Sequence, residues 1–428
     1  MRKVVAWVAC AFALSVFAVR VVIPAARDPL TAGFATCYAE ARILLEDPRQ
    51  LARVYQDGWF QQRVDRALGH HVEEIAQGQP PTMSLILAPV AWLSPGQARA
   101  VWIALSTLLW AAGIAVLARA LAVRPLHGVP PAVWIAAAAT LFSPITDNLV
   151  RGQAYPLLFF LLCLVARSIL RRPAPGGWPA GIPLGLMLIL KSAGLWLWPL
   201  LAGNRRGRIV LLAALATVAV VVAASSALMG WAIWPLYLRE SLRWLATEPS
   251  NHVTSYQTVQ SLAGHLFVRE PVWNPSPVTH LPVLAKALSV LIIGALFGVS
   301  LRCQRLDSPW LASRALTVGM FIAPLVAVAP IGEGYHYVLV FPAVMIGFWW
   351  ARRAPATETG RLRAWCLVAG CTALICVPLR CYGSPHLRDG WLALLAYPRV
   401  YGSLALWALL ARALSTDDQV VNPRHLSG

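Results

Sequence analysis

Charged residues are scarce in this sequence of 428 residues and make up 13% of it, whereas soluble globular proteins contain about 25%. Acidic residues are scarcer than basic ones: the chain has 18 Asp and Glu but 36 Lys and Arg, which gives a formal net charge of +18. This scarcity excludes an ordinary soluble domain. The basic excess lies in short loops between apolar runs, where it sets membrane topology and contacts phospholipids rather than binding nucleic acid.

Hydrophobic residues take the place of the missing charges and make up 58% of the chain. They form long runs such as 4–19, 100–118, 209–230 and 282–300. Each run approaches the roughly 20 residues that a helix needs to cross the hydrocarbon core of a bilayer. The sequence therefore predicts an all-α polytopic membrane protein.

Metal-ligand and disulfide patterns are also missing. The chain has eight cysteines, but no two of them form a C-x-x-C pair. Most lie inside apolar runs, where a thiol behaves as a small hydrophobic group. The adjacent His70-His71 is a feature of a solvated loop rather than a ligand set. We therefore expect no metal, no disulfide framework and no cofactor.

Basic residues in the loops predict how the spans are oriented. Arg2 and Lys3 precede the first apolar run, and Arg20 stands near its far end, so we expect an uncleaved span with a cytoplasmic N-terminus. The apolar stretch after Pro81 is too short to cross, and a juxtamembrane or re-entrant helix at Pro80–Leu93 keeps the basic loops inside. About twelve transmembrane helices and a cytoplasmic C-terminus follow.

The expected architecture is a single transmembrane domain over residues 1–428 with two large outer loops. The first covers 25–93 and the second 232–281. Residues 25–81 hold 8 of the 18 acids, which predicts chemistry at the outer face. The Arg- and Ala-rich, Lys-poor composition is typical of a high-GC bacterial genome, so we expect the bacterial inner (plasma) membrane.

Six short segments carry a family resemblance, in a consistent order over most of residues 4–350. They are Gly33–Glu46 (GFATCYAEARILLE), Val54–Phe60, Pro80-Pro81, Asn148–Gln153, Leu190-Lys191 and Tyr335-His336-Tyr337 before Pro342. The first two resemble the D-F-x-x-Y-Y-x-A-A-R-x-L-L-x-G opening and the Y-D-x-x-x-F segment of glycosyltransferase family 87. The others are similar to its P-P step, N-x-x-x-G-Q loop, L-K turn and W-x-H-Y motif.

This resemblance implies a glycosyltransferase C-type fold with a large first outer loop and a polyprenyl-phosphate sugar donor. It also implies transfer of mannose or a related sugar to a lipid or glycan acceptor on the extracytoplasmic face. One departure matters. The acid that the family has at the start of its first outer loop, its catalytic base, falls on Gly33 here. The base would then be another carboxylate, with Asp28 nearest and Glu40 two turns further along.

The chemistry of such a transfer selects the candidate residues. An acceptor hydroxyl must lose its proton to a carboxylate or histidine, which makes Asp28, Glu40 and His336 the catalytic candidates. The departing phosphate needs cations, and Arg151 and Lys191 lie in loops on the predicted outer face. Possible contacts to the substrates are Tyr38, Gln153, Tyr256 and Gln257.

Other interpretations of these residues remain open. Glu40 could belong to a solvated helix face, and Asp147 could be the salt-bridge partner of Arg151. A non-catalytic membrane subunit of the same fold is favoured by the glycine at position 33. A lipid or glycan transporter would instead place charges at mid-membrane. Convergence of the candidate acids and cations on one outer cavity would favour the transferase.

Overall fold

The computed structural model describes residues 2–28, 33–171, 178–191, 194–203, 205–247, 254–353 and 358–421. In this part of the chain every regular element is a helix, and extended pairing is limited to three isolated bridges. The all-α class predicted from the sequence is confirmed for these residues.

Five helical stretches are long and apolar enough to cross a membrane. They are α1 with η1 and α2 (Arg2–Phe17, Ala18–Val22, Ile23–Arg27), α6 (Pro95–Ala120), α12 (Arg205–Met229), α15 (Pro282–Cys303), and η7 with α17 (Gly334–Val340, Phe341–Ala351). Two bent pairs raise the number to seven if each is one span: α7 (Pro131–Ala139) with α8 (Ser143–Arg151), and η9 (Gly390–Ala396) with α20 (Pro398–Val421). The chain is an integral membrane protein, but the predicted twelve spans are not confirmed.

Short or broken helices account for the difference in number. The short apolar ones are α9 (Tyr155–Leu170), η4 with α10 (Trp178–Ala180, Gly181–Lys191) and α16 (Leu311–Ile322). Others that do not qualify as spans are η5 with α11 (Leu195–Leu197, Trp198–Ala202), α18 (Glu358–Ile375), α19 (Leu379–Tyr382) and η8 (Pro385–Arg388). α7 and α8 do not form one straight span, because they meet at 78°.

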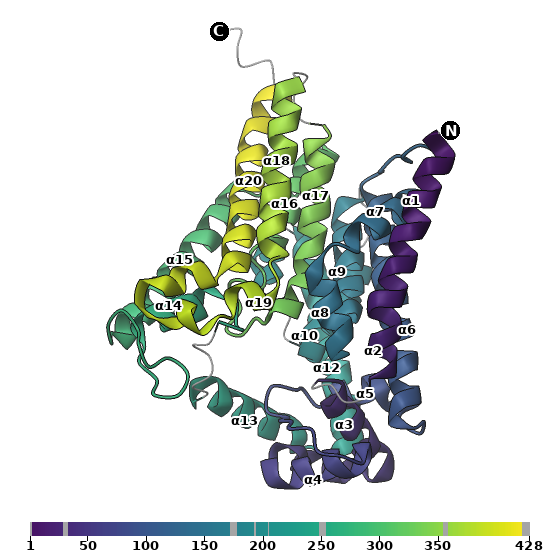
Figure 1. Ribbon diagram of the computed structural model, residues 1–428, viewed down its shortest axis with the longest axis vertical. Helices are drawn as coiled ribbons and strands as arrows, with labels where there is room; N and C mark the ends of the chain where they lie inside the picture. Colours follow the sequence, from purple (N-terminus) through teal and green to yellow (C-terminus); the bar gives the residue numbers. More distant parts are fainter. Residues whose placement is uncertain are drawn as a thin grey trace.

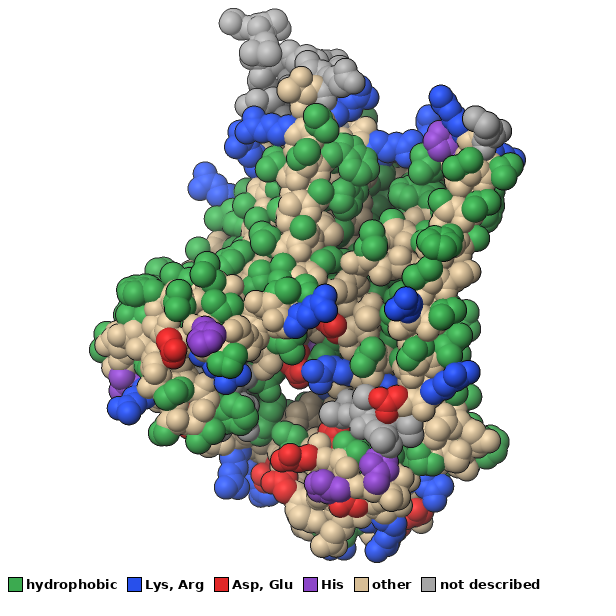
Figure 2. Space-filling model, in the orientation of Figure 1, with side chains coloured by type: hydrophobic (Ala, Val, Ile, Leu, Met, Phe, Trp, Pro, Cys, Tyr) green, Lys and Arg blue, Asp and Glu red, His purple; other side chains and the backbone are tan. Residues whose placement is uncertain are grey.

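The chain termini and the polar helices lie at opposite ends of the molecule (Figure 1). The polar helices are α3 (Phe34–Glu46), α4 (Asp57–Leu68) and α13 (Ile233–Thr247). Figure 2 shows a broad zone of hydrophobic side chains between the two ends. Near the termini the charged side chains in this view are Lys and Arg, whereas Asp and Glu side chains lie among further Lys and Arg at the end with α3 and α4.

Residues 25–93 form packed helices rather than an open loop. α3 packs against α4, η2 (Pro48–Tyr55), α5 (Met83–Leu87) and η3 (Ala88–Val90). The helix predicted at 80–93 is thus two short pieces, α5 and η3, neither of which is long enough to span. The Thr82 hydroxyl donates to the carbonyl of Ile189 at 2.6 Å. This bond joins the first loop to the end of α10.

The second large loop divides between two neighbours. α13 lies along the first loop, where the Ser241 hydroxyl donates to the carbonyl of Gln77 at 2.5 Å. α14 (Val259–Phe267) packs instead against α15 and η9. The residues 248–253 between the two helices lie outside the described part of the chain. Only α13 therefore contributes to the end of the molecule that holds α3 and α4.

A buried arginine joins the segments that surround the start of α3. Arg99 of α6 is fully buried, and its guanidinium donates to the carbonyls of Ala25 and Val150 at 2.6 Å each. The same group lies 5.3 Å from the ring centroid of Phe34. The end of the first span, the first residue of α3 and the end of α8 are thereby held together.

Candidate functional site

Lys191, the last residue of α10, lies where segments from three other parts of the chain meet. Its ammonium group interacts electrostatically with Cys37, Glu40, Glu74 and Glu333. An ammonium group at the end of an apolar helix is costly to hold unless carboxylates offset its charge. The carboxyl groups of Glu40, Glu74 and Glu333 approach it from distant segments, and this group of residues is the candidate site.

α3 presents Glu40 to this cation. The side chain is 2% exposed, and its Oε2 has no hydrogen-bond partner among the described residues. The interpretation of Glu40 as part of a solvated helix face is therefore wrong. Burial raises the pKa of Glu40 well above its ordinary value; Lys191 opposes this shift and Glu74 adds to it. Glu40 keeps its proton at a pH at which an exposed glutamate has lost it.

Glu74 was not among the candidates predicted from the sequence. It lies half-buried in the segment after α4, and its Oε1 accepts a hydrogen bond from the Gly33 N–H at 2.5 Å. Gln61 of α4 holds this segment in place. Its side-chain oxygen accepts from the Glu74 N–H at 3.0 Å, and its amide nitrogen donates to the carbonyl of Val72 at 2.7 Å. The Gly33 N–H therefore holds the Glu74 carboxylate, and Gln61 holds the backbone of its segment.

Position 33 has no room for a side chain. Gly33 has φ +96°, a conformation that residues with a Cβ rarely adopt. A Cβ built there would lie 2.7 Å from Cδ of Gln153 and would overlap its amide nitrogen. The backbone conformation therefore disfavours an acid at position 33, where a side chain would also have to displace the end of Gln153, while the Glu74 carboxylate lies against the Gly33 amide. A carboxylate reaches this place from a segment 41 residues further along the chain.

The pKa values of Glu40 and Glu74 differ because their surroundings differ. Burial raises the pKa of Glu74 as well, but hydrogen bonds from its neighbours, the Gly33 N–H among them, oppose that shift. Glu40 is almost wholly buried, whereas Glu74 retains an accessible face. Glu74 is accordingly the carboxylate that ionises first and that can meet a substrate.

His336 enters the site from η7. Its ring stacks on that of Tyr155 with centroids 4.2 Å apart, and its Nδ1 accepts a hydrogen bond from the Glu333 N–H at 3.1 Å. A neutral imidazole bonded in this way carries its proton on Nε2 and is a donor there. Electrostatic interactions with Lys191 and Arg151 place this ring at the same site. Its geometry suits a hydrogen-bond donor rather than a base.

The turn between α8 and α9 supplies Arg151 and Gln153. The Arg151 guanidinium lies 5.5 Å from the ring centroid of Tyr335, whose hydroxyl donates to Glu333 Oε1 at 2.8 Å. Gln153 is 7% exposed and packs against Gly33. Arg151 therefore lies beside Tyr335 and Gln153 beside Gly33, and their roles toward the donor and the substrate stay predictions.

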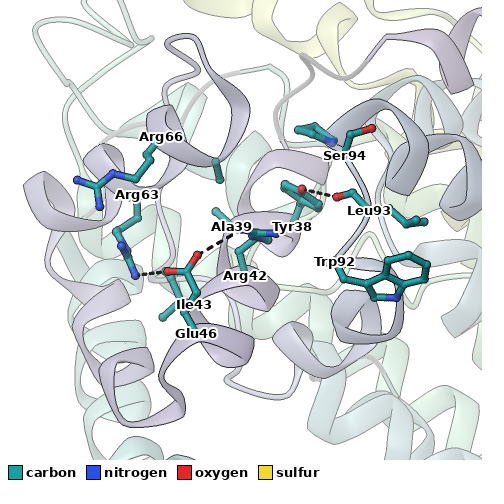
Figure 3. Close-up of a pocket in the computed structure, with 12 residues that line it drawn as sticks. Tyr38, Ala39, Arg42, Ile43, Glu46, Arg63, Arg66, Trp92, Leu93 and Ser94 are labelled. Carbon is teal, nitrogen blue, oxygen red and sulfur yellow. Dashed lines mark hydrogen bonds and ion pairs between the residues drawn. The ribbon is translucent and has the colours of Figure 1, made fainter.

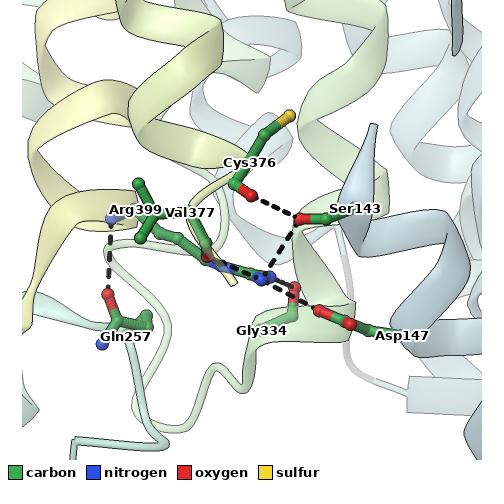
Figure 4. A network of polar contacts seen from close by, with 7 residues as sticks. All are labelled: Ser143, Asp147, Gln257, Gly334, Cys376, Val377 and Arg399. Atoms are coloured by element: carbon green, nitrogen blue, oxygen red, sulfur yellow. Dashed lines mark hydrogen bonds and ion pairs between the residues drawn. The ribbon is translucent and has the colours of Figure 1, made fainter. Parts of the chain in front are cut away.

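The proposed pair of Asp147 with Arg151 is wrong, because Asp147 pairs with Arg399 of α20 (Figure 4). The Arg399 side chain is fully buried and lies 2.9 Å from the Asp147 carboxylate. It also donates to the carbonyl of Gly334 at 2.5 Å and to that of Val377 at 3.1 Å. This guanidinium therefore connects α8, η7 and the end of α18, and holds the segment that carries His336.

Four predicted residues lie apart from Lys191 or are engaged elsewhere. Asp28 is exposed at the end of α2, where its charge acts on Arg99. The hydroxyl of Tyr38 donates to the carbonyl of Leu93 on another face of α3. Gln257 is fully buried and its amide donates to two backbone carbonyls, so packing rather than an open surface occupies it. Tyr256 is half-buried and its backbone bridges to Glu333.

The site thus combines an accessible carboxylate, a protonated one, two cations and a neutral histidine. Within the described residues, no group of three or more His, Cys, Asp or Glu side chains could hold a metal ion. This set of groups can take a proton from a hydroxyl and stabilise a departing anion. It suits a substitution in which a phosphate leaves.

Comparisons with known proteins bear on part of this site, because the matched family model includes Arg151 and Lys191 but not Glu40, Glu74 or His336. The family model described as glycosyltransferase family 87 matches residues 79–330, which is more than half of the chain. A polyprenol-phosphate-mannose-dependent alpha-(1-2)-phosphatidylinositol mannoside mannosyltransferase of Mycobacterium tuberculosis (strain ATCC 25618 / H37Rv) is 28% identical over 280 residues. That alignment covers 62% of this chain and 60% of the relative. No solved structure matches the chain significantly.

Proposed function

Because this chain belongs to glycosyltransferase family 87, we propose that it transfers mannose or a related sugar from a polyprenyl-phosphate donor to a lipid or glycan acceptor. The observation that carries the proposal is the cluster around Lys191, in which Glu40, Glu74 and His336 come from three separate segments. The name of the mycobacterial relative supports a polyprenol-phosphate-mannose donor.

The proposed reaction is a displacement at the anomeric carbon of the donor sugar. The acceptor oxygen forms a bond to that carbon as the bond to the phosphate oxygen breaks, and polyprenyl phosphate leaves. The acceptor proton passes to the Glu74 carboxylate, which must lie within about 3 Å of the hydroxyl. Glu40, which keeps its proton, stabilises the ionised Glu74 instead of competing for the acceptor proton.

The cations serve the leaving group in this proposal. Lys191 and Arg151 stabilise the charge that develops on the phosphate, and the Nε2–H of His336 donates to one of its oxygens. Glu74 and Glu333 contribute negative charge near the Lys191 ammonium group. The bound phosphate then replaces part of that carboxylate charge around the ammonium group.

The membrane arrangement is part of the same proposal. We place the site at the extracytoplasmic face of a bacterial inner membrane, with both termini cytoplasmic. The fold is of the glycosyltransferase C type, with about twelve membrane-embedded segments, some of them too short to span alone. The whole chain forms one domain, and residues 25–93 and 232–281 make the outer face. This orientation is supported by the position of α3 and α4, which lie at the end of the molecule opposite to the start of α1 and the end of α20 (Figure 1).

The class of donor is the first prediction to test. Membranes containing the wild-type chain should transfer labelled mannose from polyprenyl-phosphate-mannose and not from GDP-mannose, because the cations around Lys191 are proposed to serve a single departing phosphate. Counting label in the lipid and glycan fractions measures the transfer. Membranes without the chain are the control. Equal transfer from GDP-mannose alone would contradict the proposed donor.

A further inference from the structure

A cavity lies beside α3, on the side of the helix where Tyr38, Arg42 and Glu46 project (Figure 3). Its volume is about 330 Å³, which is within the range of small-molecule sites. Residues 36, 37 and 40 of α3 face the candidate site, whereas Tyr38, Arg42 and Glu46 line the cavity. At 100° per residue these two sets lie on opposite sides of the helix. The cavity is therefore separate from the site already described.

The cavity is basic. Arg42 of α3 and Arg63 and Arg66 of α4 line it, against the single carboxylate of Glu46. Glu46 pairs with Arg63 at 2.7 Å and with Arg42 at 3.5 Å. Arg66 is exposed and pairs with no carboxylate among the described residues. Three guanidinium groups around one carboxylate leave the cavity with an excess of two positive charges.

The start of α6 adds a further feature that favours anions. Ser94 and Pro95 line the cavity, and α6 runs for 26 residues from this point. The N-terminal end of a long helix carries partial positive charge, and here Ser94 and Gln97 cap its first N–H groups with a capping box. Together with the guanidinium groups it makes an environment suited to a phosphate.

Apolar side chains beside the cavity indicate where its ligand comes from. Trp92 lines it and is 71% exposed, while the neighbouring Leu45 and Leu85 are 52% and 37% exposed. Exposed tryptophan and leucine beside arginines are typical of the boundary between lipid tails and headgroups. A soluble anion has no acyl chains to contact these exposed apolar side chains, whereas a lipid does.

We propose that this cavity binds the phosphate-bearing headgroup of an anionic membrane lipid, with Arg66, Arg63 and Arg42 on the phosphate and Trp92 beside the acyl chains. The lipid phosphate competes with Glu46 for the guanidinium groups. Its binding does not depend on the transferase activity, so a failure of one proposal leaves the other standing.

The test measures binding of short-chain lipids to the purified full-length chain in detergent. Dioctanoyl phosphatidylglycerol should bind at least about tenfold more tightly than dioctanoyl phosphatidylcholine and than glycerol 3-phosphate. Arg66→Gln should weaken the phosphatidylglycerol affinity by about tenfold, because it removes one charge-assisted contact. Glu46→Gln should strengthen it, because it removes the competing carboxylate.

Arg49→Gln is the matched control, since Arg49 is exposed in the same segment of the chain but does not line the cavity. It should bind phosphatidylglycerol as the wild type does. Arg66 makes no ion pair with a described residue, so its variant should also keep the wild-type melting temperature. Equal affinity for the two lipids, equal affinity for glycerol 3-phosphate, or an unchanged affinity in Arg66→Gln would each overturn the proposal.

Discussion

Glu74→Gln should lower the turnover of sugar transfer by about 10²- to 10⁴-fold, which is the contribution of a positioned general base. Glutamine has nearly the same shape, and its side-chain oxygen can still accept the hydrogen bond from the Gly33 N–H. The fold of the segment is therefore retained while the proton acceptor is lost. Initial rates at saturating polyprenyl-phosphate-mannose measure the effect.

The adjacent Glu73 provides the matched control. Its side chain is exposed, so Glu73→Gln should transfer sugar at the wild-type rate. Burial raises the pKa of Glu74, so the wild-type rate should fall as the pH falls through a value above that of an ordinary glutamate. The Glu74→Gln variant should lack this acid limb. A variant with wild-type turnover and an unchanged pH profile would exclude Glu74 as the base.

Arg399→Met should lower the free energy of unfolding by about 1–3 kcal/mol, the usual cost of leaving buried hydrogen-bond acceptors without a donor. Methionine fills much of the same volume but leaves Asp147 without its partner. It also leaves the carbonyls of Gly334 and Val377 without a donor. Because Arg399 anchors η7, transfer activity should fall as well. Denaturant titration in detergent measures the first effect.

Arg302→Met is a suitable comparison, because Arg302 is exposed at the end of α15. It should change the unfolding free energy by less than about 0.5 kcal/mol. Arg399→Lys should fall between the two variants, since one ammonium group cannot replace the forked contacts of a guanidinium. An Arg399→Met protein as stable as the wild type would show that this network does not hold η7.

Single residues with unusual surroundings could be predicted from the sequence. Lys191 stands out as a cation between two short apolar segments, and His336 as a titratable residue at a span boundary. The structure brings both into one site with Glu40 and Arg151. In each case the residue type conflicts with its apolar neighbours, and that conflict is visible without knowledge of the fold.

Glu74 could not be predicted in this way. Nothing within its own segment separates it from Glu73, and its role depends on a hydrogen bond to Gly33, 41 residues away. Tyr38 illustrates a second limit. It lies two residues from Glu40, but a helix turns by about 200° over that distance, so the two side chains lie on different sides of α3. Only the packing of α3 distinguishes the two faces.

The number of spans stays a prediction for a related reason. The apolar composition of a segment indicates that it is buried in lipid or protein, but it does not show whether the segment crosses the membrane. α10 and α16 are apolar because other helices enclose them, and the segment 130–145 breaks between α7 and α8. Short and broken helices of this kind bring Lys191 and Arg151 to the site. The site therefore forms where helices are too short or too bent to be regular spans.

The most direct test of the central claim measures donor binding and sugar transfer on the same preparations of wild type, Glu74→Gln and Lys191→Met. The account predicts that Glu74→Gln binds labelled polyprenyl-phosphate-mannose with wild-type affinity but does not transfer the sugar. It predicts that Lys191→Met loses about tenfold in donor affinity, because it lacks the cation for the phosphate. Wild-type transfer by Glu74→Gln, or wild-type donor affinity in Lys191→Met, would contradict the account.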